Sequence, residues 1–343
     1  MKVGTLEVVF HRTVRVADGR TPSNLPPSLG TIQAYKVADY KNRCPEEWDE
    51  GAVFVALHDT EALWISFRHH ATPVAVLVGA GGINALTGEK LGTRLEKDNY
   101  IVTPPQPWLD GWKSDDGCVY QFVATPYKKG EGITVAEQLI GEESKTGAIG
   151  LAVFEPKDVR ALKAVSKPVE GYGDSPTDGD FTWVAPHEAK LTGATPVGKA
   201  PWSLSDILYR AGEKGSTDES QHIGEMGIGR GGKIHQKIYP DPYGIEVWQD
   251  APVAAVAVYV VNAQAFEEIT GQKIPVPVGH EIYEGVWFGL KDQDEPDVTG
   301  TNKFTGLKSA FLGDLSNVFK PESAKKKETT PKKSGKARKA KAK

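Results

Sequence analysis

The stretch HIGEMGIGRGGKIHQKIYPDPYGIEVW, residues 222–248, combines glycines and reactive side chains more densely than any other part of the chain. Glycine occupies five of the nine positions from 224 to 232, and residues 227–232 fit the pattern GxGxxG, with Lys233 directly behind them. In a dinucleotide site this pattern opens a helix whose N-terminus binds phosphate. Here residues 234–239 alternate as a strand does, so we interpret the glycines as a loop that lets two strands approach closely.

Two functional alternatives stay open for the same stretch. Backbone amides of a glycine-rich loop form a nest for an anion, and Arg230 and Lys233 would assist. His222, Glu225 and His235 are weaker candidates for the acid–base groups of a hydrolase, with or without a metal. Zinc needs three or four converging ligands, and the chain has neither HExxH nor paired CxxC. We therefore expect no metal site, and the sequence specifies no cofactor.

Composition favours a β-rich globular protein. Of the 343 residues, 39% are hydrophobic and 25% charged, which is ordinary for a globular chain. The 37 glycines and 23 prolines indicate many turns. Alternating or β-branched runs predict strands at 5–16, 53–57, 62–67, 73–78, 118–124, 148–154 and 253–261, with 53–67 as a hairpin and 253–261 as a central strand.

Helices are expected to be few and short. Thr134 and Glu137 form a capping box, and Gly141 stands where such a helix would end. Residues 203–211 and 263–270 also show helical spacing. The predicted fold is mainly β or α+β, built on antiparallel, sandwich-like sheets. We expect an N-terminal β-rich unit at 1–166, a long loop or boundary at 167–201, and a second β-rich unit at 202–320 packed on the first.

A lysine-rich tail follows at 321–343. It carries nine lysines and one arginine against two glutamates, a local charge of +8, which leaves −12 on the other 320 residues of a chain with net charge −4. A tail of this composition is expected to be disordered and to bind nucleic acid or another polyanion through counterion release. The candidate contacts are Lys325, Lys326, Lys327, Lys332, Lys333, Lys336, Arg338, Lys339, Lys341 and Lys343.

A second candidate binding segment spans 104–117. Trp108, Asp110 and Trp112 alternate there, and tryptophan beside carboxylate is suited to stacking on a sugar or an apolar ligand. The competing interpretation is a loop that its tryptophans pin to the core. We favour the pinned loop and keep the ligand site as the alternative.

The remaining sequence features indicate the cellular compartment of the protein. Cys44 and Cys118 have no CxxC spacing and are expected to be free thiols, although pairing stays open. The N-terminus has no apolar core of a signal peptide, and the longest apolar run, 252–261, is too short to span a bilayer. We expect a soluble cytoplasmic protein, with a nuclear or nucleoid location as an alternative through the tail.

Parts of three segments resemble a family of uncharacterised proteins from bacteria and some fungi. They are the run Gln121 to Ala124, the pair Glu137 and Gln138 with Gly141, and residues 226–241. The resemblance extends over residues 50–310. It implies no known activity, cofactor or catalytic residue, and the lysine-rich tail departs from the family's pattern.

Two classes of function follow. The first is a non-enzymatic binding protein with a polyanion-binding tail. The second is a hydrolase using His222, Glu225 and His235. The absence of a recognisable nucleophile or ligand set favours binding. The small-molecule ligand and the oligomeric state stay undetermined at this level.

Overall fold

The computed structural model describes residues 1–19, 21–68, 72–127, 133–162, 224–274, 282–283 and 297–310. Residues Met1–Ala310 form one compact unit. The strands are β1 (Lys2–Val3), β2 (Leu6–Thr13), β3 (Arg15–Val16), β4 (Thr31–Ile32), β5 (Tyr35–Lys36), β6 (Val53–Ala56), β7 (Ala62–Arg68), β8 (Val74–Ala80), β9 (Ile83–Asn84), β10 (Ile101–Thr103), β11 (Trp108–Leu109), β12 (Gly111–Lys113), β13 (Cys118–Pro126), β14 (Ile149–Phe154), β15 (Glu225–His235), β16 (Ala254–Val261) and β17 (Ile282–Tyr283). The described α-helices are α1 (Val135–Ile140) and α3 (Ala263–Thr270), and the 3₁₀ helices are η1 (Val37–Tyr40), η2 (Gly141–Glu143), η3 (Val159–Ala161), η5 (Ile245–Val247) and η6 (Asn302–Phe304). The prediction of a mainly β protein with few short helices is confirmed.

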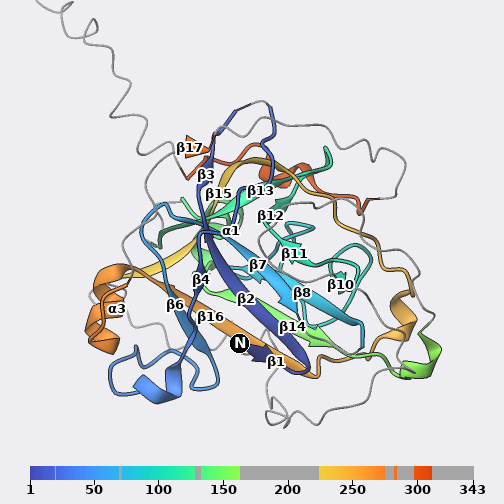
Figure 1. The fold of residues 1–343 in the computed structure, drawn as a ribbon, viewed down its shortest axis with the longest axis horizontal. Helices are drawn as coiled ribbons and strands as arrows, with labels where there is room; N and C mark the ends of the chain where they lie inside the picture. Colours follow the sequence, from blue (N-terminus) through green and yellow to red (C-terminus); the bar gives the residue numbers. More distant parts are fainter. Residues whose placement is uncertain are drawn as a thin grey trace, which may run out of the picture. The chain divides into compact units, whose positions relative to one another are not determined.

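A sheet of 15 strands dominates the structure (Figure 1). Its path runs β1-β2-β7-β13-β15-β16-β14-β8-β10, and every neighbouring pair on this path is antiparallel. Strand β6 joins β16 in parallel. Strands β3 and β17 form a separate parallel pair. Strand β15 follows the undescribed residues 163–223, which include the predicted boundary at 167–201, and it pairs with β13 from the N-terminal part.

Each face of the sheet contributes side chains to a different hydrophobic cluster. In β16, Val256, Val258 and Val260 belong to one cluster, and Ala257, Tyr259 and Val261 belong to the other. The first cluster also contains inward residues of β2, β7, β8 and β14, so the sheet folds over and encloses this core from two sides. The second cluster is covered by α3 and by Trp48, whose ring stacks on Tyr259 at 4.2 Å. Burial on both faces explains the continuous apolar run at 253–261, and the predicted central strand is confirmed.

The glycine-rich stretch forms a strand, so the loop predicted at 224–232 is wrong. Strand β15 pairs with β13 along most of its length. Its glycines leave room for neighbours that a side chain would displace. A Cβ at Gly227 would lie 2.6 Å from Thr134 Cγ2, and one at Gly232 would lie 2.2 Å from the carbonyl oxygen of Ala17. Other segments therefore approach these glycines closely, as expected, but the glycines lie within strand β15 and not in a loop.

Gly232→Ala is expected to lower the free energy of unfolding by about 3 kcal/mol, because the added methyl would overlap backbone and the chain at 16–17 would have to move. Gly231→Ala is the matched control. Its nearest contact is Val123 Cγ2 at 2.8 Å, and its nearest backbone contact is the Gln121 carbonyl oxygen at 3.2 Å, so a smaller displacement is needed and we expect a loss of about 1 kcal/mol. Urea unfolding of both variants measures the difference. Equal losses would contradict the backbone overlap.

The end signals predicted for α1 are confirmed, and the helix predicted at 263–270 forms. Thr134 and Glu137 form the complete capping box of α1, and Gly141 ends it with a positive φ of 55°. Asn262 caps α3, and Gly271 ends that helix in the left-handed conformation. The predicted helix at 203–211 lies outside the described residues. None of the helices that the structure describes is long and apolar enough to cross a bilayer.

The predicted hairpin at 53–67 is wrong in its pairing. Strands β6 and β7 both form, but β6 pairs with β5 and β16, whereas β7 lies between β2 and β13. The connection turns at Thr60, which has a positive φ of 61°, and the buried Glu61 follows it. The side chain of Glu61 accepts the His58 N–H and pairs with Arg12 of β2, which draws β7 toward β2.

Candidate functional site

The structure does not bring the proposed hydrolase residues together. His222 lies outside the described residues. Glu225 and His235 occupy opposite ends of β15, and ten residues of strand span about 33 Å. The Glu225 carboxylate accepts the Gly147 N–H at 3.0 Å, which fixes it at the far end of the strand.

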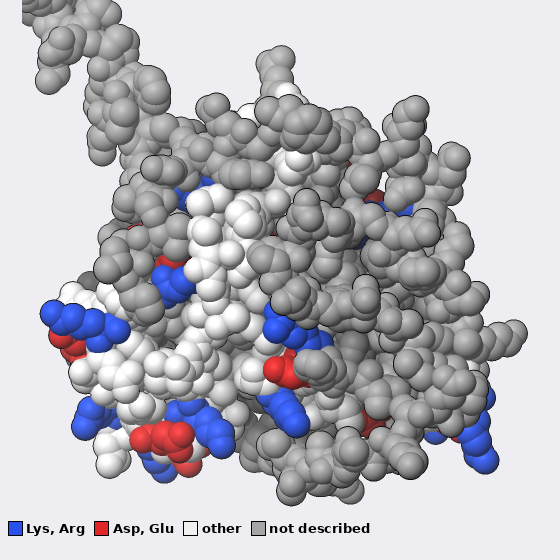
Figure 2. Space-filling model, viewed as in Figure 1, with Lys and Arg blue, Asp and Glu red and all other residues white. Residues whose placement is uncertain are grey.

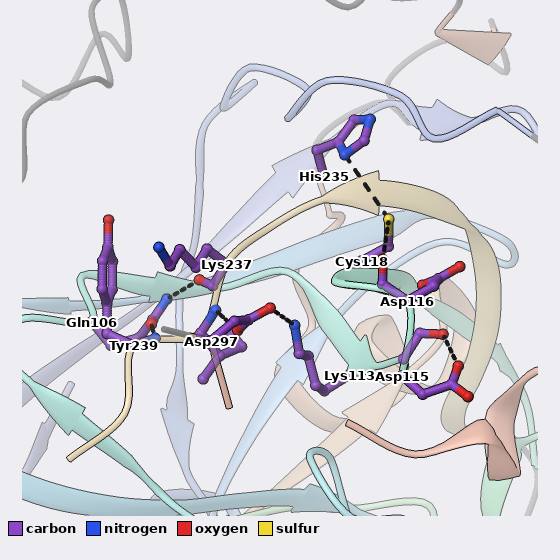
Figure 3. A network of polar contacts seen from close by, with 11 residues as sticks. Gln106, Lys113, Asp115, Asp116, Cys118, His235, Lys237, Tyr239 and Asp297 are labelled. Carbon is purple, nitrogen blue, oxygen red and sulfur yellow. Dashed lines mark hydrogen bonds and ion pairs between the residues drawn. The ribbon is translucent and has the colours of Figure 1, made fainter. Parts of the chain in front are cut away.

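His235 instead lies beside Cys118 of β13 (Figure 3). The Cys118 Sγ is 3.9 Å from His235 Nδ1, and the thiol also approaches the carbonyl oxygen of Asp116 at 3.9 Å. Burial raises the pKa of the Cys118 thiol to about 11 and lowers the pKa of His235. At neutral pH both groups are therefore uncharged, and the pair lacks the thiolate that a cysteine nucleophile requires. Cys44 and Cys118 are both free and buried, so no disulfide joins them.

Arg230 and Lys233 lie over the same aromatic ring. The Arg230 guanidinium is 4.2 Å and the Lys233 ammonium 5.3 Å from the ring centroid of Tyr120. Each cation also has an acidic partner, Asp18 for Arg230 and Asp116 for Lys233. An anion held here would compete with these carboxylates, and the backbone around it is strand rather than a nest.

A polar frame holds the segment that leaves β15. Asp297 accepts the Ile238 N–H at 2.9 Å and pairs with the buried Lys113 at 2.6 Å (Figure 3). Gln106 accepts the Tyr239 N–H at 2.9 Å and donates to the Lys237 carbonyl at 3.4 Å. These contacts hold the backbone of Lys237 and Tyr239, whereas the His235 side chain lies beside Cys118.

The predicted Trp/Asp segment divides between two environments. Trp112 is buried in the core, where its ring centroid lies 5.3 Å from that of Phe122 and its indole donates to the Gly229 carbonyl at 3.2 Å. Trp108 and Asp110 instead occupy the opposite face of the sheet, and Gln236 holds both through their backbone, accepting the Asp110 N–H at 3.0 Å and donating to the Trp108 carbonyl at 3.1 Å. Trp112 thus behaves as a core anchor, and Trp108 and Asp110 remain as a candidate site.

Strand register extends this face across three strands. His11 is the partner of Trp64, and Trp108 is the partner of Ser66. The β7–β11 register ends at Leu109, and the Asp110 carbonyl accepts the Phe122 N–H of β13 at 3.0 Å. Directly opposed residues share a face, so the His11 imidazole and the Trp64 and Trp108 indoles stand in one row. The contacts agree, because the His11 ring stacks on Trp64 at 3.8 Å and the Trp64 ring meets Trp108 at 6.4 Å.

Burial shifts the pKa values of His11 and Asp110 toward their uncharged forms. Burial, with a smaller contribution from Arg68, lowers the pKa of His11 to about 4. Burial raises the pKa of Asp110 well above the usual aspartate range, opposed by the nearby indole of Trp108. His11 Nε2 and Nδ1 lie 2.8 Å from Ser66 Oγ and 3.0 Å from Ser28 Oγ. An imidazole held neutral by burial can both donate and accept a hydrogen bond.

Sequence reasoning identified Trp108 and Asp110 but missed His11, Trp64 and Ser66. The alternation at 62–67 does place Trp64 and Ser66 on one face, opposite Leu63 and Ile65. That signal does not name the strands beside them. Among the residues that the structure describes, no three His, Cys, Asp or Glu side chains converge as a metal site.

Comparisons of the chain with protein-family models, with curated proteins and with solved structures found no significant match.

Proposed function

We propose that this is a non-enzymatic binding protein whose lysine-rich segment, residues 321–343, binds nucleic acid or another polyanion. The observation that supports this proposal is the uneven distribution of charge, with +8 in that segment and −12 in the rest of the chain. Ten basic side chains within 23 residues supply the counterion release that drives binding to phosphate backbones. They are Lys325, Lys326, Lys327, Lys332, Lys333, Lys336, Arg338, Lys339, Lys341 and Lys343. A location at chromosomal nucleic acid, in a nucleus or a nucleoid, belongs to the same proposal.

The charge arrangement of Met1–Ala310 supports this assignment to the tail. Basic side chains of this unit lie next to carboxylates, both in buried pairs such as Arg12–Glu61 and in exposed pairs such as Lys90–Glu143. On the face drawn in Figure 2, the described basic and acidic side chains are intermingled rather than gathered in separate patches. Mixed charge attracts a polyanion weakly, because neighbouring carboxylates repel the phosphates.

Binding of the full chain to a short DNA duplex and to single-stranded RNA is expected to weaken steeply with salt. Each lysine that neutralises a phosphate contributes about 0.9 to the slope of log K against log salt on duplex DNA. Replacement of Lys325, Lys326 and Lys327 by glutamine should therefore reduce this slope by about 3. Filter retention at several salt concentrations measures it.

The matched control removes the same charge from the body. Lys41, Lys90 and Lys157 are exposed and paired with Glu50, Glu143 and Asp250, so their replacement by glutamine costs little stability. We expect the slope of this control to equal that of the original chain. An equal reduction in both triple variants would show that net charge, rather than the tail, determines binding. No retention of the original chain would remove the proposal.

The hydrolase alternative receives no comparable support from the described residues. It requires His222, Glu225 and His235 at one site, and the length of β15 keeps the last two apart. The Cys118–His235 pair is buried and uncharged, which favours a packing role over nucleophilic catalysis.

A further inference from the structure

A cavity of about 480 Å³ opens where β2, the end of β7 and the segment 31–34 meet. Strand β4, at the start of that segment, lies beside β2 (Figure 1). The polar residues that line the cavity are Glu7, Thr31, Gln33 and Arg68. Cavities of this volume are typical of sites for small molecules.

Strand register places the charged side chains of the cavity on one face of the sheet. Glu7 is directly opposite Arg68 in the β2–β7 ladder, so the two side chains point to the same side. Val9 lies two residues after Glu7 and shares this face, and it also lines the cavity. The cavity therefore combines a carboxylate, a guanidinium and the apolar side chain of Val9.

The two charges are open to a ligand. Among the residues that the structure describes, no ion pair or hydrogen bond engages the side chain of Glu7 or Arg68. The Arg68 charge contributes, after burial, to the lowered pKa of His11, which places the guanidinium near this face of the sheet. The N-terminal ammonium of Met1, at the edge of the cavity, already donates to the Val8 carbonyl at 2.7 Å.

The pair of charges selects the kind of occupant. Glu7 would repel a purely anionic ligand, and Arg68 would repel a purely cationic one. A molecule that carries a carboxylate and an ammonium close together can form a charge-assisted hydrogen bond with each of them. An α-amino acid holds both groups on one carbon atom. Direct pairing of Glu7 with Arg68 would compete weakly, because ion pairs open to solvent contribute little.

We propose that this cavity binds a free α-amino acid, with Arg68 holding its carboxylate, Glu7 accepting from its ammonium and Val9 contacting its side chain. Thr31 and Gln33 add a hydroxyl and an amide at the exposed rim, where they can hydrogen-bond to the ligand. This site is independent of polyanion binding by residues 321–343, so either proposal can fail without the other.

A titration of the full chain with leucine, N-acetylleucine and leucinamide tests the site, with binding followed by saturation-transfer nuclear magnetic resonance of the ligand. N-acetylleucine lacks the ammonium, and leucinamide lacks the carboxylate. Each derivative should bind about tenfold or more weakly than leucine, because one charge-assisted hydrogen bond is lost. Equal binding of all three molecules would overturn the proposal, as would the absence of leucine binding at millimolar concentration.

Two variants assign the roles of the charged residues. In Arg68→Gln, leucine should bind no better than leucinamide, because the partner of the carboxylate is gone. In Glu7→Gln, leucine should bind no better than N-acetylleucine. A residue that only shapes the cavity would weaken all three ligands equally, so that result would also overturn the assignment.

The matched controls are Lys90→Gln and Glu143→Gln, which remove the same charges from an exposed ion pair elsewhere on the chain. Both should bind leucine as the original chain does. Weaker leucine binding in these controls would show that net charge, and not the cavity, determines the interaction. Circular dichroism of each variant verifies that it is folded.

Discussion

Replacement of Glu61 by alanine is expected to lower the free energy of unfolding by about 3–5 kcal/mol. Arg12 and Glu61 form an ion pair at 2.5 Å, and their side chains are only 7% and 4% exposed. The variant would leave the Arg12 guanidinium buried without its carboxylate, and it would still donate to the Ala56 carbonyl at 3.1 Å. It would also leave the His58 N–H without the carboxylate oxygen that now lies 2.8 Å away. Chemical denaturation of the variant and the original chain measures the loss.

Two controls separate this buried pair from ordinary surface charge. Glu50→Ala removes the partner of Lys41 in a pair whose side chains are 63% and 59% exposed, and it should cost less than about 1 kcal/mol. The double variant Arg12→Met with Glu61→Leu removes both buried charges and should regain most of the stability that Glu61→Ala loses. A loss in Glu61→Ala no larger than in Glu50→Ala would mean that water or a rearranged side chain compensates Arg12.

The strands before and after Glu61 were predictable, whereas their pairing was not. The apolar runs at 53–57 and 62–67 predict strands because each carries its own pattern. The choice between a hairpin and two separate ladders depends on strands that are distant in the sequence, β2 for β7 and β16 for β6. The helices show the opposite case. The capping box of Thr134 and the glycine after Thr270 are local signals, so both ends of α1 and α3 could be predicted.

The loop predicted for the glycine-rich stretch was wrong because glycine is favoured at a position for either of two physical reasons. In a turn it reflects positive φ, and of the glycines in this stretch Gly224 has a φ of 94° just before β15 begins. Within β15 it reflects a shortage of space, since Gly227 and Gly232 lie against Thr134 and Ala17. The sequence does not contain the position of these neighbours. Tertiary packing therefore overrides the local preference against glycine in strands.

The candidate site, too, could be predicted only in part from the sequence. Trp108 and Asp110 were noticed because tryptophan and carboxylate alternate over a short segment. Their partner Trp64 sits on β7, and His11 sits on β2, so only the register of three strands assembles the row. The raised pKa of Asp110 arises from its burial, which residue order alone does not reveal.

Asp297→Ala is expected to lower the free energy of unfolding by about 3 kcal/mol. Lys113 has a side-chain exposure of 1%, and its ammonium pairs with Asp297 at 2.6 Å. The loss should lie at the lower end of the range for buried pairs because Asp297 itself is 28% exposed and partly screened by solvent. The second carboxylate oxygen of Asp297 accepts the Ile238 N–H, so alanine would also release the segment that follows β15.

Asp297→Asn separates these two contributions. The amide oxygen can still accept the Ile238 N–H, whereas the charge that compensates Lys113 is lost. We therefore expect Asp297→Asn to unfold at a denaturant concentration between those of Asp297→Ala and the original chain. Adding Lys113→Met to Asp297→Asn removes the uncompensated cation and should restore stability. If Asp297→Ala instead costs no more than Glu89→Ala, which breaks a pair with the partly exposed Lys303, then the Lys113 ammonium reaches solvent and the frame around residues 235–239 does not depend on this ion pair.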